Sequence, residues 1–202
     1  MPTLASAVRV GVVCGALVLG LRLWLKWGGP FPGDGWFARL QGQTWRQPAA
    51  VQDFNLFFQV IGTPAVATAT VVAILPFVAR AAGLRGVMFV LVACAGVAVN
   101  AGLKELSGPT PLMTQLNATG LNYPSGHTVY AVVLCGALAV LARRSGRRDV
   151  AWPLLALIPL MGFFRVTAAT HFVSDVVAAF LVGGAWLNLA AALTLEPARR
   201  GR

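Results

Sequence analysis

Charged side chains are scarce in this sequence. Of its 202 residues only 11% are Asp, Glu, Lys or Arg, whereas 57% are hydrophobic, and the mean hydropathy is +0.74. A soluble domain carries about 25% charged residues. This composition therefore excludes an ordinary soluble protein and indicates an integral membrane protein.

Acidic residues, cysteines and histidines are also few. The six acidic residues form no cluster of the kind that Mg²⁺ prefers. The three cysteines, Cys14, Cys94 and Cys135, lie inside apolar runs without metal-ligand spacing, which favours packed thiols over disulfides or metal ligands. We expect no cofactor and no metal. Only two histidines are present, His127 and His171.

Basic residues outnumber acidic ones, and the formal net charge is +10. A nucleic-acid binder gathers such residues on one face or in a tail. Here they form small clusters between apolar runs, so we interpret them as signals of membrane topology and expect no nucleic-acid partner.

The apolar runs predict an all-α bundle of six transmembrane helices in a single domain, residues 1–202. Each run is long enough for a membrane helix or nearly so: Leu4–Leu25, Val60–Ala79, Gly86–Leu103, Thr128–Ala142, Val150–Phe164 and Val176–Leu195. The first run lacks a small-residue cleavage pattern after it, so we expect a retained helix and not a signal peptide. Within the domain, residues 1–59 hold the first helix and an external segment, and residues 60–195 hold the chemistry-bearing core.

Arginine clusters predict which ends of these helices face the cytoplasm. If the helices alternate, three clusters fall on one side: Arg80 with Arg85, the four arginines 143, 144, 147 and 148, and the tail arginines 199, 200 and 202. The positive-inside rule makes this side, and both termini, cytoplasmic. The external segment Gly28–Gln59 mixes tryptophans with polar residues. It fits an interfacial amphipathic piece or, equally, an ordinary connector with buried aromatics.

Alternation places three polar segments together on the external side: 104–111, 123–127 and 165–175. Pro124, Ser125 and Gly126 precede an apolar run, as expected for a helix start with a serine cap. The N-terminus of that helix would attract an anion, and Lys104 and Arg165 add positive charge. This combination suits a phosphate, although a carboxylate or sulfate fits the same physics.

The two histidines suggest the reaction. His171 and Asp175 are four residues apart and would share one helix face, so the aspartate can set the tautomer of a nucleophilic histidine. His127 can protonate the leaving oxygen. Two other interpretations stay open: helix-end residues that merely cap or snorkel, and a metal site of His127, His171 and Asp175, which the nearby cations disfavour.

At these residues the chain resembles the type 2 phosphatidic acid phosphatase superfamily, whose motifs are Lys-x6-Arg-Pro, Pro-Ser-Gly-His and Ser-Arg-x5-His-x3-Asp. The second motif is intact at 124–127, and the third is matched at Arg165, His171 and Asp175, with Phe164 in place of its serine. The first is partial, because Pro111 occupies the arginine position and no arginine lies between Lys104 and Arg143.

The resemblance implies a role for each matched residue. His171 would form a phosphohistidine, Asp175 would orient it, and His127 would act as general acid and then activate water. The phosphoryl oxygens would be bound by Lys104, Ser125, Gly126 and Arg165, without a metal. Apart from the resemblance, we expect either that a basic side chain of the external segment, Arg39 or Arg46, replaces the missing arginine, or that the enzyme runs slowly, and we favour the replacement.

The expected substrate is a lipid phosphate within the membrane. The fourth and fifth apolar runs are about 22 Å long at 1.5 Å per residue, which would hold the motifs near the headgroups. By family analogy we lean to a polyprenyl diphosphate in a bacterial cell membrane, with the site extracytoplasmic. Phosphatidate or phosphatidylglycerol phosphate is the alternative substrate, and a non-catalytic lipid-phosphate binder or transporter is the alternative function.

Overall fold

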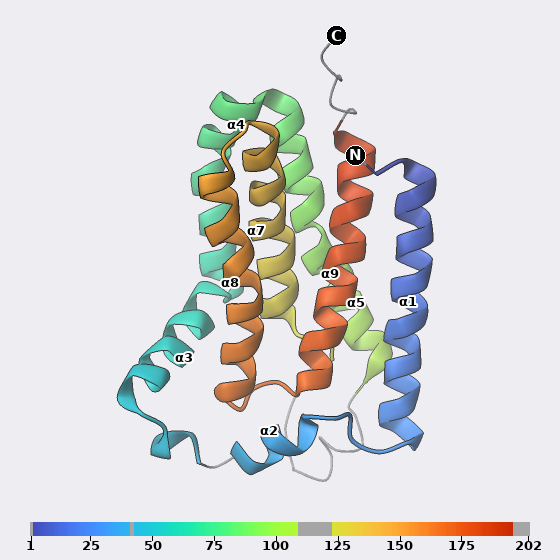
Figure 1. Ribbon diagram of the computed structural model, residues 1–202, viewed down its shortest axis with the longest axis vertical. Coiled ribbons are helices and arrows are strands. Elements are labelled where there is room, and N and C mark those ends of the chain that lie inside the picture. Colours follow the sequence, from blue (N-terminus) through green and yellow to red (C-terminus); the bar gives the residue numbers. More distant parts are fainter. Residues whose placement is uncertain (1, 41–42, 109–122, 196–202) are drawn as a thin grey trace.

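The computed structural model describes residues 2–40, 43–108 and 123–195, and within them the regular structure is entirely helical. Most helices run along one long axis, and short helices cross one end of the bundle (Figure 1). The elements are α1 (Leu4–Trp27), α2 (Asp34–Leu40), η1 (Thr44–Arg46), α3 (Ala49–Ile61), α4 (Pro64–Cys94), α5 (Gly96–Ser107), α7 (Gly126–Arg144), α8 (Arg148–Thr167) and α9 (Val173–Thr194). The all-helical membrane class is thus confirmed.

Helix α7 is the centre of the bundle. In its most apolar 18-residue stretch 61% is buried inside the protein, whereas the corresponding share is 11% in α1, which packs on α9 at the edge. Two glycines let α7 and α9 approach closely: a Cβ at Gly136 would lie 2.5 Å from Leu187, and one at Gly183 would lie 2.8 Å from Val132. Small residues serve this purpose at helix contacts in membranes, where close packing holds helices together.

Within the described residues, five helical stretches are long and apolar enough to cross a membrane. One of them, Pro64–Ser107, has 44 residues, and at 1.5 Å per residue it would be about twice as long as a hydrocarbon core is thick. Its backbone leaves the helical conformation at Gly83, with φ 66° and ψ −170°, and the ribbon turns over the end of the bundle there (Figure 1). Two of the six expected spans fall on either side of this break. The count of six stays a prediction.

Several predicted helix ends were wrong. Helices α7 and α8 have 19 and 20 residues, about 28 and 30 Å at 1.5 Å per residue, because polar and charged flanking residues continue each helix. The argument from short helices for a site near the headgroups therefore fails. Residues 60 and 61, expected in a membrane span, close α3 instead, and Pro64 begins the next helix as its first residue.

The two ends of the bundle differ in charge. The break at Gly83, flanked by Arg80 and Arg85, and the turn between α7 and α8 lie at one end, together with the start of α1 (Figure 1). The described parts of the polar segments expected to form a site, residues 104–108, 123–127 and 165–175, gather at the other end, beside α2 (Figure 1). The tail arginines 199, 200 and 202 lie outside the described residues, and the assignment of the arginine end to the cytoplasm stays a prediction.

Candidate active site

The N-terminus of α7 forms one wall of the candidate site. Ser125 is the N-cap residue as predicted, but its side chain does not cap the helix. Its hydroxyl instead accepts a hydrogen bond from Oγ1 of Thr128 at 3.1 Å, and its N–H donates to the Asp175 carbonyl at 3.1 Å. The first backbone N–H groups of a helix have no partner within the helix. Those of Gly126 and the next two residues are therefore available to an anion.

The turn between α8 and α9 sets the position of His171. The Arg165 carbonyl accepts hydrogen bonds from the N–H groups of Thr170 and His171, both at 3.2 Å, and from the Thr170 hydroxyl at 2.9 Å. Ala169 adopts a left-handed φ of 52°, a conformation that costs a non-glycine residue some strain. The four-residue spacing had predicted that His171 shares a helix with Asp175. This was wrong, because His171 lies in the turn before α9.

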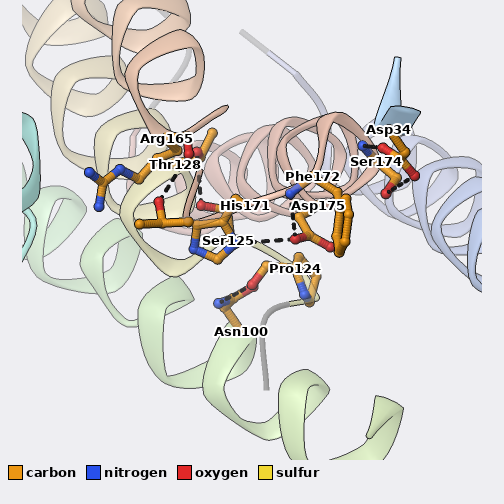
Figure 2. A network of polar contacts seen from close by, with 11 residues as sticks. Asp34, Asn100, Pro124, Ser125, Thr128, Arg165, His171, Phe172, Ser174 and Asp175 are labelled. Atoms are coloured by element: carbon orange, nitrogen blue, oxygen red, sulfur yellow. Dashed lines mark hydrogen bonds and ion pairs between the residues drawn. The ribbon is translucent and has the colours of Figure 1, made fainter. Parts of the chain in front are cut away.

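His171 and Asp175 nevertheless pair. Nδ1 of His171 lies 3.2 Å from Oδ2 of Asp175, and both residues are buried (Figure 2). The same Oδ2 accepts a hydrogen bond from the N–H of Phe172 at 3.0 Å, so Asp175 also caps the start of α9. A carboxylate at Nδ1 favours the tautomer that leaves Nε2 unprotonated. Burial lowers the pKa of His171, and the hydrogen bond and charge of Asp175 oppose that shift.

Two cations border this pair. A Cβ on Gly126 would lie 3.8 Å from Nζ of Lys104, so the lysine ends at the start of α7. Arg165 is 2% exposed. Its side chain donates a hydrogen bond to the Asn55 carbonyl at 3.5 Å, and its Nε has no acceptor among the described residues. Buried charge is costly unless it is paired. The buried Arg165 guanidinium therefore favours an anion in the site.

His127 is the second residue of α7, in the same first turn as Gly126, and the charges of Arg165, His171 and Lys104 reach it. Its Nε2 lies 3.1 Å from the carbonyl oxygen of Gln59. A carbonyl can only accept, so Nε2 carries the proton and Nδ1 is the nitrogen left to exchange one. The structure thus brings all seven predicted site residues to one end of the bundle.

Gly62 is a site residue that the sequence analysis missed. It closes α3, and a Cβ there would lie 2.0 Å from Cδ2 and 2.8 Å from Cγ of His127. Its absent side chain makes room for the imidazole ring. A glycine before a Thr-Pro helix start is an ordinary cap signal, and nothing in the local sequence ties it to a histidine 65 residues away.

Asp34 was also missed. It is fully buried, and its carboxylate accepts hydrogen bonds from the N–H and the hydroxyl of Ser174, both at 2.9 Å, and from the N–H of Phe31 at 3.2 Å. Burial raises the pKa of Asp34, against the effect of these hydrogen bonds. Figure 2 shows this contact beside the His171–Asp175 pair. Asp34 therefore ties the predicted external segment to the first turn of α9.

Helix α3 holds the same segment against α8. Asn55 accepts a hydrogen bond from the Thr167 hydroxyl at 2.7 Å and donates one to Gln47 at 2.9 Å, while Gln47 donates to the Thr167 carbonyl at 2.7 Å. Phe164, which replaces the third motif's serine, stacks on Phe58 with ring centroids 4.8 Å apart. The phenylalanine that replaces the motif's serine therefore packs α8 against α3.

The cations expected to replace the first-motif arginine belong to α2 and η1, and their role stays a prediction. Arg46 lies over the Trp45 ring, with its guanidinium carbon 4.8 Å from the centroid, and Arg39 is exposed. A different arginine reaches the end of α5: Arg22 of α1 donates to the Ser107 carbonyl and, at 3.3 Å, to the Gly108 carbonyl. The motif's arginine position, Pro111, lies outside the described residues.

The arrangement has the parts needed for phosphoryl transfer: a nucleophile oriented by a carboxylate, a second histidine, and cations beside a helix N-terminus. Within residues 2–40, 43–108 and 123–195 no three His, Cys, Asp or Glu residues are grouped so as to hold a metal ion. Residues 103–197 match the family model described as PAP2 superfamily, which confirms the resemblance. No curated protein and no solved structure matches the chain.

Proposed function

We propose that this chain, a PAP2 superfamily member by its residues 103–197, hydrolyses the phosphate ester or diphosphate of a membrane lipid through a phosphohistidine. Members of this superfamily are phosphatases, so phosphoester hydrolysis is the general activity. The observation that carries the finer proposal is the buried His171–Asp175 hydrogen bond of 3.2 Å, which lies within electrostatic reach of Arg165 and Lys104.

In the first step, Nε2 of His171 attacks the phosphorus atom, and the bond from phosphorus to the leaving oxygen breaks. His127 enters this step as the imidazolium, with one proton held by the Gln59 carbonyl at Nε2, and it donates the other proton, from Nδ1, to the leaving oxygen. Asp175 stabilises the positive charge that develops on the His171 ring. Lys104, Arg165 and the N–H groups at the start of α7 stabilise the charge on the three equatorial oxygens.

In the second step, His127 removes a proton from water, whose oxygen attacks the phosphorus of the phosphohistidine. The nitrogen–phosphorus bond breaks, inorganic phosphate leaves, and His171 regains its original state. With a diphosphate lipid the products are the lipid monophosphate and inorganic phosphate. Both steps use only side chains and backbone groups of this protein, and the proposal includes no metal ion.

The surroundings of the site support a lipid substrate. The described helices that carry the motifs are apolar enough to span a membrane, and the site lies at one end of them. A water-soluble phosphate ester would not require such a scaffold. The arginine-rich opposite end favours an extracytoplasmic site by the positive-inside rule, and a polyprenyl diphosphate remains our first choice over phosphatidate or phosphatidylglycerol phosphate.

The test is phosphate release by purified protein from a panel of lipid phosphates in detergent with EDTA, alongside His171→Ala. We expect turnover by the wild type on at least one lipid phosphate and none by the variant. Brief incubation with substrate labelled in the transferred phosphate should leave an acid-labile, base-stable label on the wild type alone. Equal phosphate release by His171→Ala, or a wild type inactive on the whole panel, would refute the proposal.

A further inference from the structure

A long groove runs along the outer face of the bundle between α1, α5 and α9, with a volume of about 1010 Å³. Its walls are mostly apolar side chains and glycines, such as Val12, Leu103 and Trp186. The polar lining residues gather at one end: Arg22, Lys26, Ser107 and Tyr123. The groove is therefore amphipathic along its length, with two cations at one end only.

That polar end adjoins the candidate active site. Arg22 donates to the carbonyl groups of Ser107 and Gly108, one turn beyond Lys104. Its guanidinium carbon lies 5.9 Å from the ring centroid of Tyr123, which directly precedes the Pro-Ser-Gly-His motif. Arg22 and Asp175 interact electrostatically. A phosphate held between the catalytic histidines would thus place its lipid substituent at the mouth of this groove.

The length of the groove bears on the kind of lipid. On α1 the lining runs from Ala7 to Lys26, about 28 Å at 1.5 Å per residue. That is close to the ~30 Å thickness of a whole hydrocarbon core. An acyl chain anchored at one surface reaches only to the middle of the membrane, about 15 Å. Only a hydrocarbon chain longer than such an acyl chain would fill the half of the groove near Ala7.

The groove is open at its glycines. A Cβ built on Gly11 or Gly15, both in the lining, would meet nothing within 4 Å, so these positions form a floor that no neighbouring side chain fills. Gly20 on the same helix also has open space around it but does not line the groove. A large side chain at Gly11 would therefore obstruct the groove, and the same side chain at Gly20 would serve as the control.

Building on the proposed function, we propose that this groove binds the hydrocarbon chain of a polyprenyl phosphate or diphosphate whose phosphate end lies at Arg22. The cations at the mouth complement the phosphate, and the apolar walls complement a chain longer than one leaflet. In this arrangement Arg22 is a further phosphate-binding residue. It brings from α1 a positive charge that the first motif of this chain lacks.

The groove is tested with Gly11→Trp and its control Gly20→Trp, using undecaprenyl diphosphate and farnesyl diphosphate as long and short substrates. Gly11 lies 11 residues from Arg22, about 16 Å along the helix, so a tryptophan there obstructs the groove just beyond the reach of a chain that ends at mid-membrane. We expect the kcat/KM ratio of long to short substrate to fall at least about tenfold in Gly11→Trp and to stay at the wild-type value in Gly20→Trp. Binding of undecaprenyl phosphate in nanodiscs, which needs no turnover, should weaken in Gly11→Trp alone.

The possible outcomes separate the two proposals. Turnover of both diphosphates with the same ratio in all three proteins refutes the groove assignment and leaves the phosphatase function standing. A wild type without turnover refutes the function, and the nanodisc measurement then decides the groove by itself. Equal loss of undecaprenyl phosphate binding in both tryptophan variants would assign the effect to α1 packing and refute the groove.

The role of Arg22 is tested with Arg22→Gln, Arg22→Lys and, as the control on the same helix, Arg9→Gln. Loss of a cation that stabilises a transferred phosphoryl group lowers kcat/KM by about 10²-fold or more. We expect that loss in Arg22→Gln, partial retention in Arg22→Lys, and the wild-type value in Arg9→Gln. Equal activity of Arg22→Gln and wild type refutes phosphate binding, and so does equal loss in Gln and Lys variants, which indicates that Arg22 only joins α1 to α5.

Discussion

The contact between Gly62 and His127 gives the sharpest test of the candidate site. In Gly62→Ala the new methyl group would lie 2.0 Å from Cδ2 of the imidazole, well inside van der Waals contact. The backbone at Gly62 has φ −92° and ψ 1°, a conformation with negative φ that non-glycine residues adopt in type I turns. The substitution therefore acts on the position of the His127 ring and not on the conformation of the chain.

The magnitude follows from the size of this clash. Separating the two carbon atoms to an ordinary contact requires a shift of more than 1 Å, and such a misplacement of a catalytic group can lower the rate about 10²-fold. The loss cannot exceed that of removing His127, since general acid catalysis contributes about 10²–10⁴-fold. We expect kcat on a lipid phosphate to fall about 10²-fold with little change in thermal stability.

The assay compares kcat of wild type, Gly62→Ala, His127→Ala and the double variant. Gly102→Ala is the matched control, because a Cβ at Gly102 meets nothing within 4 Å. If both substitutions act through one imidazole, the double variant should be no slower than His127→Ala. Wild-type kcat in Gly62→Ala, or losses that multiply in the double variant, would refute the assignment of His127.

Four further predictions concern the pair His171–Asp175, the metal, the pH profile and the orientation. Asp175→Asn should keep a small activity, about 10⁴-fold below wild type as in serine-protease triads, and activity equal to wild type would remove Asp175 from the mechanism. Activity should survive EDTA and be inhibited by vanadate; loss in EDTA and recovery with Mg²⁺ would contradict this. Because burial lowers the pKa of His171 and the nucleophile must be unprotonated, the acid limb of kcat/KM should have its midpoint below the ordinary histidine value of about 6.5; a midpoint above it would show that the charge of Asp175 dominates. In cysteine-free protein, a cysteine at Ser107 should react with an impermeant thiol reagent in intact cells and one at Ser145 only after permeabilisation, whereas the reverse pattern would place the site in the cytoplasm.

The fold class could be predicted because hydropathy is a strong local signal. Each apolar run of the sequence falls largely within described helices, since the cost of burying backbone polar groups in lipid forces these segments to be helical. The helix ends could not be predicted as well. Arginines 143, 144 and 148 extend α7 and α8 beyond their apolar runs, because long basic side chains reach water from the last turns of a helix.

The gathering of the motif residues at one end of the bundle could be predicted, while the residues that contact them could not. His171 and Asp175 were paired from their spacing, although the pair forms across a turn and a helix cap instead of one helical face. Gly62, Asn55 and Asp34 contact site residues or their neighbours over separations of 65 to 140 positions in the sequence. No local pattern records contacts of that range.

These supporting residues all come from the segment between α1 and α4, and each contact falls on a motif residue or near one. Asp34 binds Ser174, the neighbour of Asp175, and Gln59 binds His127 itself. Asn55 accepts from Thr167 and offers its carbonyl to Arg165, a residue buried deep enough that its charge needs a fixed partner. A constellation works only if its geometry is held by surrounding contacts. This segment, which the sequence left open as an interfacial amphipathic piece or an ordinary connector, therefore belongs, by its contacts, to the structure that positions the two histidines and the arginine.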